Sequence, residues 1–226
     1  MKILNFHGVG PLVRDVDPGE YACWLDTGHF EAILDCVLER SNILITFDDG
    51  NASDYDIVLP ALIRRGLRAV FFVCSGRVGK QTFLNAAQVR ELSSQGMAIG
   101  SHGIHHRSWR TLGRTELQDE VAGSRMALED VCGKSVDLAA CPFGGYDWRV
   151  LRVLKKSGYR AVYTSDGGDC KESQWLRART TIKRSFSVAE VQQIIQHRPK
   201  PARRLVDGIR ISLKRLRFRD CTNYNI

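Results

Sequence analysis

The sequence predicts an α/β protein with a parallel sheet, for two reasons. Short apolar, β-rich runs alternate with segments of helical period along its 226 residues. These runs are continuously apolar rather than alternating with polar residues, which is typical of strands covered by helices. A (β/α) barrel and an open doubly wound sheet both meet these conditions, and in both the functional residues gather at the carboxyl ends of the strands.

Seven such segments are predicted to be strands. In chain order they are KILNF (2–6), ILITF (43–47), RAVFFVC (68–74), MAIGS (97–101), VDLAA (136–140), RAVYT (160–164) and RTTIK (179–183). Helices are predicted between them, because three polar residues are each followed three positions later by Gln or Glu, the pattern of a capping box. The pairs are Asn85 with Gln88, Thr115 with Gln118, and Ser187 with Glu190. A core-facing helical stripe is formed by Leu117, Val121, Leu128 and Val131.

Composition narrows the class of protein. Hydrophobic residues make up 43% and charged residues 26% of the chain, and no apolar run approaches the roughly 20 residues that span a bilayer. The opening MKILNFHGVG reaches a histidine before a signal-like apolar stretch develops. The seven cysteines form no CxxC pair, so we expect reduced thiols. These features predict a soluble, cytoplasmic protein.

Charge divides the chain into two parts. Residues 198–226 hold nine Lys or Arg against two Asp, and so carry +7 of the net charge of +8. The first 197 residues are therefore close to neutral, which argues against a nucleic-acid-binding fold. We expect one domain over 1–197 and a basic, amphipathic extension over 198–226. The extension fits an anionic membrane surface, a partner such as a glycosyltransferase, or the base of the barrel.

Polar clusters follow three of the predicted strands. Asp48 and Asp49 come after ILITF, SHGIHH (101–106) comes at the end of MAIGS, and a third cluster follows VDLAA. His102 and His106 with one aspartate would form an open zinc site, because two imidazoles and a carboxylate leave positions for water and substrate. A cation would also offset the repulsion between the adjacent acids. Each cluster alone fits a turn, a helix cap or a polar loop, and it is their shared position that favours a metal site.

Ordered motifs over residues 2–184 resemble the polysaccharide deacetylases that share the NodB homology domain, carbohydrate esterase family 4. TFDDG (46–50) is similar to the first motif of that family. HGIHH (102–106) is similar to the second, except that Gly103 replaces a hydroxyl residue. PFGGYD (142–147) looks like the third.

The resemblance implies a distorted, NodB-like (β/α) barrel of about seven parallel strands. It implies a divalent metal held by Asp49, His102 and His106, with Asp48 as the general base. Zn²⁺ is the first choice of metal, with Co²⁺, Ni²⁺, Mn²⁺ or Fe²⁺ as alternatives. His105 would be a ligand only if the register of the loop were different.

The sequence departs from the family pattern at two places. The third motif normally has an arginine two residues before its proline, where this chain has Ala140, so the group that orients the base is expected to be missing. No Leu-x-His motif ends the barrel, and His197 is the only late histidine. His7 follows the first strand. In the exported poly-N-acetylglucosamine deacetylases, which the chain also resembles here, a histidine in a similar segment takes over the role of general acid. We favour His7 over His197 as general acid, because a closed barrel brings its first strand beside its last.

Together with these residues, the resemblance implies a metal-dependent hydrolase that removes N-acetyl groups from an amino sugar in a glycan or glycan precursor. Backbone N–H groups near Phe143 and Gly144 would bind the oxyanion. The substrate would be an oligosaccharide, or a lipid-linked or nucleotide-linked sugar, in envelope or exopolysaccharide biosynthesis near the inner face of the membrane. Two alternatives stay open: a catalytically impaired sugar- or metal-binding partner of a glycosyltransferase, and a hydrolase of a non-carbohydrate C–N bond.

Overall fold

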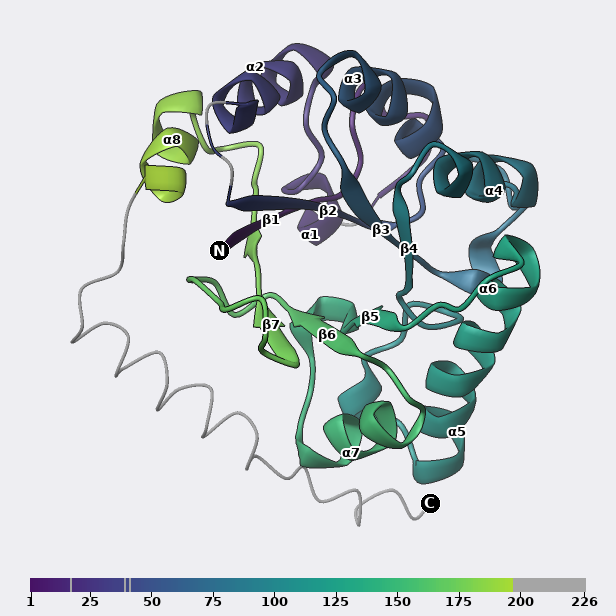
Figure 1. The fold of residues 1–226 in the computed structure, drawn as a ribbon. Helices are drawn as coiled ribbons and strands as arrows, with labels where there is room; N and C mark the ends of the chain where they lie inside the picture. Colours follow the sequence, from purple (N-terminus) through teal and green to yellow (C-terminus); the bar gives the residue numbers. More distant parts are fainter. Residues whose placement is uncertain (17, 39, 41, 197–226) are drawn as a thin grey trace, which may run out of the picture.

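The computed structural model describes residues 1–16, 18–38, 40 and 42–196, which form a (β/α) barrel (Figure 1). Its sheet has eight strands in the order β7-β6-β5-β4-β3-β2-β1-β8, and neighbouring strands are parallel. The strands are β1 (Lys2–Phe6), β2 (Ile43–Asp49), β3 (Ala69–Val73), β4 (Ala98–Ser101), β5 (Leu138–Ala140), β6 (Ala161–Thr164), β7 (Leu176–Ala178) and β8 (Thr180–Thr181). The predicted barrel is confirmed, because strand order follows chain order without the reversal of a doubly wound sheet.

The last strand closes the ring and is interrupted at one residue. β7 pairs with β6, β8 pairs with β1, and only Arg179 separates the two segments. The strand predicted over 179–183 therefore begins earlier and ends at Thr181. The ring is also thin between β4 and β5, which share the single register pair Ser101 and Ala139. These two features account for the distortion of the barrel.

Helices surround the ring on its outer side (Figure 1). They are α1 (Pro18–Tyr21), α2 (Thr27–Leu38), α3 (Leu59–Arg64), α4 (Ala86–Ser94), α5 (Arg114–Gln118), α6 (Ser124–Cys132), α7 (Trp148–Lys156) and α8 (Val188–Gln196). Short 3-10 turns are η2 (Ser75–Arg77), η3 (Trp109–Thr111) and η5 (Pro142–Gly144), and π-helical turns are η1 (Asp54–Val58) and η4 (Asp119–Gly123). Within the described ranges, no helix is long and apolar enough to cross a bilayer.

Two of the three predicted helix caps are confirmed. Asn85 and Gln88 form a reciprocal capping box, and Ser187 exchanges hydrogen bonds with Glu190 in the same way. The pair Thr115 and Gln118 is wrong. Helix α5 begins one residue before Thr115, and the N–H of Gly113 donates to the carboxylate of Glu116, which is a stronger acceptor than the amide of Gln118.

Successive side chains along each strand point alternately to the outer helices and to the barrel interior, which gives the protein two separate apolar clusters. Leu4, Phe6, Ile45, Phe47 and Phe71 belong to the cluster that packs against the outer helices. Their neighbours in the chain point inward, where an apolar base is formed by Ile3, Val70, Phe72, Leu138, Ala161 and Tyr163. Further along the strands the interior becomes polar, with fully buried Asn5, Thr46 and Arg179. This polar layer lies directly below the carboxyl ends of the strands and supports the site.

Two further predictions concern the cysteines and the tail. None of the six cysteines that the structure describes forms a disulfide. His197 and the predicted extension 198–226 lie outside the described residues.

Candidate active site

Asp48 at the end of β2 is held by a buried arginine. Its Oδ1 accepts from Nη1 of Arg179 at 2.7 Å and its Oδ2 from Nη2 at 2.8 Å, while Asn5 Nδ2 donates to Oδ2 at 3.0 Å. Burial raises the pKa of this carboxyl, but the charge and hydrogen bonds of Arg179, with a smaller contribution from His102, outweigh it. The net pKa lies well below that of an ordinary aspartate, so Asp48 is ionised at neutral pH.

Arg179 itself is fixed on every side. Nη1 also donates to Asn5 Oδ1 at 2.8 Å and Thr46 Oγ1 at 3.2 Å, Nε donates to the carbonyl of Thr164 at 3.2 Å, and the guanidinium stacks over Phe72 at 5.1 Å. The expectation drawn from Ala140, that no group orients the base carboxylate, is therefore wrong. Arg179 lies at the break between β7 and β8 and reaches Asp48 at the end of β2, passing Asn5 of the intervening strand β1.

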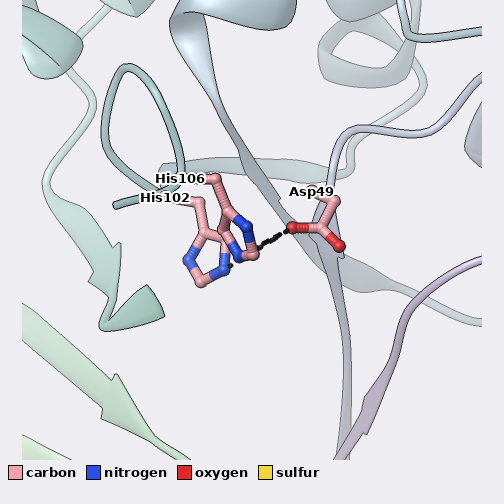
Figure 2. A group of neighbouring side chains, drawn as sticks. All are labelled: Asp49, His102 and His106. Atoms are coloured by element: carbon pink, nitrogen blue, oxygen red, sulfur yellow. Dashed lines mark ion pairs between the residues drawn. The ribbon is translucent and has the colours of Figure 1, made fainter. Parts of the chain in front are cut away.

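Asp49, the next residue, faces two histidines instead (Figure 2). Its Oδ1 lies 3.2 Å from His106 Nε2 and 3.8 Å from His102 Nε2, and the three ligand atoms lie within 4.8 Å of one another. This oxygen is buried and has no hydrogen-bond partner among the described residues. A buried, unpartnered carboxylate oxygen beside two imidazole nitrogens fits a divalent cation, which needs such a donor set.

Both histidines are suited to bind a cation. His102 is buried, and its Nδ1 lies 2.9 Å from the carbonyl of Ala140, so Nδ1–H donates there and Nε2 keeps its lone pair. Burial lowers the pKa of His102, although the charges of Asp48 and Asp49 oppose this. Burial also lowers the pKa of His106 to about 4. Both imidazoles are therefore neutral at pH 7, as metal ligands must be.

The other predicted site histidines take different positions. His105 is exposed and is not part of the Asp49–His102–His106 group. His7 is half-buried just after β1, and its attraction contributes to the lowered pKa of Asp48 and of Asp49, so it lies near both carboxylates. Its Nδ1 is buried and has no hydrogen-bond partner within the part of the chain that the structure describes.

The predicted oxyanion turn lies beside the histidines. Phe143 in η5 has φ +56°, which is uncommon for a residue with a side chain, and its ring centroid lies 4.4 Å from that of His106. The Gly144 N–H donates to the carbonyl of Cys141 at 2.9 Å and is thus used within the turn. Of the two predicted positions, Phe143 is the one whose side chain contacts a predicted metal ligand, His106.

Sequence reasoning missed Arg179 because its signal is not local. The residue lies in RART (177–180), a segment without a recognisable motif. The argument that a closed barrel brings the last strand beside the first applies to Arg179 as well as to His7. Polar residues Asn5 and Thr46 inside otherwise apolar strands were the available hint that a buried charge sits between them.

Fold and site together define a (β/α)-barrel protein whose carboxyl edge holds one carboxylate and two imidazoles placed for a metal. The sequence model of the family described as polysaccharide deacetylase matches residues 37–162. The chain belongs to this family.

Relatives agree with that assignment. The chain is 30% identical over 129 residues to the peptidoglycan-N-acetylmuramic acid deacetylase PdaA of Bacillus subtilis, covering 56% of this chain and 48% of the relative. It is 27% identical over 124 residues to the chitooligosaccharide deacetylase of Azorhizobium caulinodans, covering 54% and 58%. The deacetylase PplD of Streptococcus pyogenes has the same fold, with a TM-score of 0.75 at 18% identity over 87% of this chain and 98% of that one. The chain spans about half the length of the curated relatives it matches.

Proposed function

We propose that this chain is a metal-dependent hydrolase that removes N-acetyl groups from an amino sugar. One observation carries the proposal: two adjacent aspartates have separate environments, Asp49 beside two neutral imidazoles and Asp48 in an ion pair with Arg179. A single deacetylation site needs both, a ligand and a base. Membership of the polysaccharide deacetylase family, and relatives named for deacetylation of chitooligosaccharides and peptidoglycan, support the same reaction.

Asp49, His102 and His106 would hold the cation, with Zn²⁺ as the expected metal. When bound, such a cation polarises a carbonyl and makes water a better nucleophile at neutral pH. Asp48 acts as the general base. A carboxylate accepts about four hydrogen bonds, and Asp48 uses three for Arg179 and Asn5, so one site remains for the proton of the attacking water.

His7 serves as the general acid in this proposal. Its loop is fixed because the N–H of Val9 donates to Ser53 Oγ at 3.2 Å, and Gly8 packs so closely on the ring of Trp24 that a Cβ would lie 2.1 Å from it. In its protonated form, an imidazole held in this place would give its proton to the departing amine. The N–H of Phe143 would donate to the developing oxyanion.

The substrate class follows from this chemistry and from the relatives. An N-acetylated oligosaccharide is the first candidate, and a lipid-linked or nucleotide-linked sugar in envelope or exopolysaccharide biosynthesis is the second. The alternative of a catalytically impaired binding partner was based on two features, the alanine at position 140 and the absent Leu-x-His motif. The first no longer supports it, because Arg179 provides the positive charge beside Asp48 that the family arginine would provide. Its other ground, the absent Leu-x-His motif, is tested through His7.

The experiment measures acetate released from N-acetylated oligosaccharides and sugar nucleotides by the Zn²⁺-loaded protein. Asp48→Asn is expected to lower the rate by about 10²- to 10⁴-fold, the usual contribution of a general base, while bound Zn²⁺ stays near one per chain. Asp56→Asn, an exposed aspartate in the following turn, is the matched control and keeps the wild-type rate. His7→Ala is expected to lose rate without losing metal.

The outcomes separate the alternatives. Zn²⁺ bound with no acetate released from any of these substrates would favour a binding module or a different C–N bond as substrate. Full activity in Asp48→Asn would refute the base, and full activity in His7→Ala would refute the acid.

A further inference from the structure

The loop that carries both histidine ligands has an unusual backbone. Gly103 and His106 have φ values of +80° and +54°, a region that a residue with a side chain enters only when its surroundings hold it there. The ligand spacing of the site depends on this loop, because His102 and His106 must point to one spot from either end of it. The question is which residue outside the loop fixes it.

A buried glutamate from the neighbouring helix meets the loop backbone. Glu120 is only 3% exposed, and its Oε2 accepts from the N–H of Ile104 at 2.7 Å and of His105 at 3.2 Å, with Oε1 3.3 Å from the same His105 nitrogen. These two N–H groups belong to the residues between the ligands. A charged acceptor makes such hydrogen bonds about twice as strong as a neutral one.

The space beside the loop is filled by the same carboxylate. A Cβ added to Gly103 would lie 2.8 Å from Glu120 Oε2 and 3.0 Å from Trp109 Nε1. No side chain fits at position 103 while Glu120 keeps its place. Gly103, which replaces the hydroxyl residue of the family motif, therefore leaves the space that the carboxylate of Glu120 occupies.

A π-helical turn delivers this carboxylate. Glu120 lies in η4, which joins α5 to α6, and Ser124 begins α6 on the same side. Ser124 Oγ donates to the carbonyl of Gly103 at 2.9 Å and accepts from Ser101 Oγ at 2.8 Å. The extra residue of a π turn shifts the side chains that follow it and is frequent at functional sites. Here it brings an acceptor and a donor to the loop together.

We propose that Glu120 is a positioning residue of the metal centre, which holds the loop 102–106 in its ligand-ready conformation through the N–H groups of Ile104 and His105. The inference rests on the proposed metal site. It predicts that removing the carboxylate weakens metal binding although Glu120 contacts neither the cation nor the substrate.

The test compares Glu120→Ala, Glu120→Gln and Asp119→Ala in the full chain. Zn²⁺ affinity is measured by competition with a chromophoric chelator, and Co²⁺ absorption spectra report the coordination geometry. Glu120→Ala is expected to bind Zn²⁺ about 10- to 100-fold more weakly and to change the Co²⁺ spectrum. Glu120→Gln can place its carbonyl oxygen where Oε2 lies, so it recovers most of the affinity. Asp119 is the exposed acid beside Glu120, and its variant keeps the wild-type affinity and spectrum.

Amide hydrogen exchange of the metal-free proteins supplies a second measurement. Loss of a charged hydrogen bond is expected to speed exchange at Ile104 and His105 by about tenfold or more in Glu120→Ala. If Glu120→Ala lowers the Tm but leaves the Zn²⁺ affinity, the Co²⁺ spectrum and the loop exchange rates unchanged, the proposal is overturned. It is also overturned if Glu120→Gln binds Zn²⁺ as weakly as Glu120→Ala. A wild-type protein that binds no Zn²⁺ would refute the proposed metal site and with it the ligand-positioning role, whereas the exchange rates would still show whether Glu120 holds the loop.

Discussion

Asp48 and Asp49 are neighbours in the chain and equally buried, but they end up in opposite situations. Asp48 points into the barrel, where Arg179 and Asn5 donate three hydrogen bonds to it. Asp49 turns toward the histidines with φ +83°, and its Oδ1 has no hydrogen-bond partner within the described part of the chain. Side chains of the fold donate hydrogen bonds to both oxygens of Asp48, whereas the described residues donate none to Oδ1 of Asp49. The difference separates the aspartate that forms an ion pair inside the barrel from the aspartate proposed to bind a cation.

The largest change in the free energy of unfolding is expected when the ion pair between Asp48 and Arg179 is broken. Arg179→Ala would leave the charge of Asp48 buried and unpaired, which should lower the free energy of unfolding by about 3–5 kcal/mol. Urea unfolding of the metal-free protein measures it. Arg184→Ala, which removes an exposed arginine from the following loop, is the control and should cost far less.

A double variant sharpens the same prediction. Because most of the cost comes from the stranded charge, Asp48→Asn added to Arg179→Ala should cost less than it does in the wild type, or even restore some stability. Additive costs would contradict an ion pair as the cause.

The next effect is a dependence on pH that belongs to the Asp49 side. The folded pKa of His106 is about 4, below its ordinary value of 6.5, so between these values the unfolded chain binds more protons. Stability of the metal-free protein should be complete above about pH 6.5 and fall as the pH approaches 4, by up to about 3 kcal/mol. Asp48, with a lowered pKa, keeps its contribution throughout this range and loses it only in stronger acid.

Urea unfolding at pH 7 and pH 4.5 checks this prediction, with His106→Asn as the control. The variant lacks the titrating imidazole, so its stability should change less over the same interval. Parallel losses in both proteins would show that other groups cause the pH dependence.

Measuring stability with and without Zn²⁺ tests the proposed difference between the two aspartates. In EDTA, Asp49→Asn should have nearly the stability of the wild type, because Oδ1 of Asp49 has no hydrogen bond to lose among the described residues and Asn tolerates positive φ. With Zn²⁺ at 100 times its Kd, the wild type should gain about 2.7 kcal/mol, whereas Asp49→Asn should gain much less at the same concentration. Thermal or urea unfolding with and without Zn²⁺ measures both. A variant that is less stable in EDTA and still gains fully from Zn²⁺ would reverse the assignment.

The sequence allowed the Asp49 side to be predicted more fully than the Asp48 side, for a physical reason. Asp49 ends β2 and His102 directly follows β4, with His106 four residues later, and the carboxyl ends of parallel strands meet at one edge of the barrel. Six of the seven predicted strands were placed to within two residues for the same reason, since their apolar runs are local signals. The conformation of the loop 102–106, with positive φ at Gly103 and His106, has no comparable signal.

The partners of these residues were not predictable, because they come from elements distant in sequence. Arg179 reaches Asp48 only because the last strand breaks between β7 and β8, and no periodicity marks that break. Glu120 reaches the histidine loop through a π turn inside what reads as one continuous helix. Each of these buried charges is placed by a local irregularity, a strand break at Arg179 and a π turn at Glu120. Patterns of hydrophobic residues indicate regular helices and strands and carry no signal for such irregularities.

The smallest effect concerns the second arginine of the site. Arg77 Nη1 lies 3.5 Å from Asp49 Oδ1 without forming a hydrogen bond, its side chain is 24% exposed, and its guanidinium packs over Phe83 at 4.9 Å. Arg77→Ala should therefore change the free energy of unfolding by less than about 1 kcal/mol, the usual value of a partly exposed ion pair. Zn²⁺ should bind at least as tightly as in the wild type, because a positive charge beside the site is gone. Arg77→Met, which keeps the packing on Phe83, separates charge from contact area. A loss of stability comparable to that of Arg179→Ala would mean that Asp49 depends on an ion pair with Arg77 as Asp48 depends on one with Arg179. The two aspartates would then not differ in the way described above.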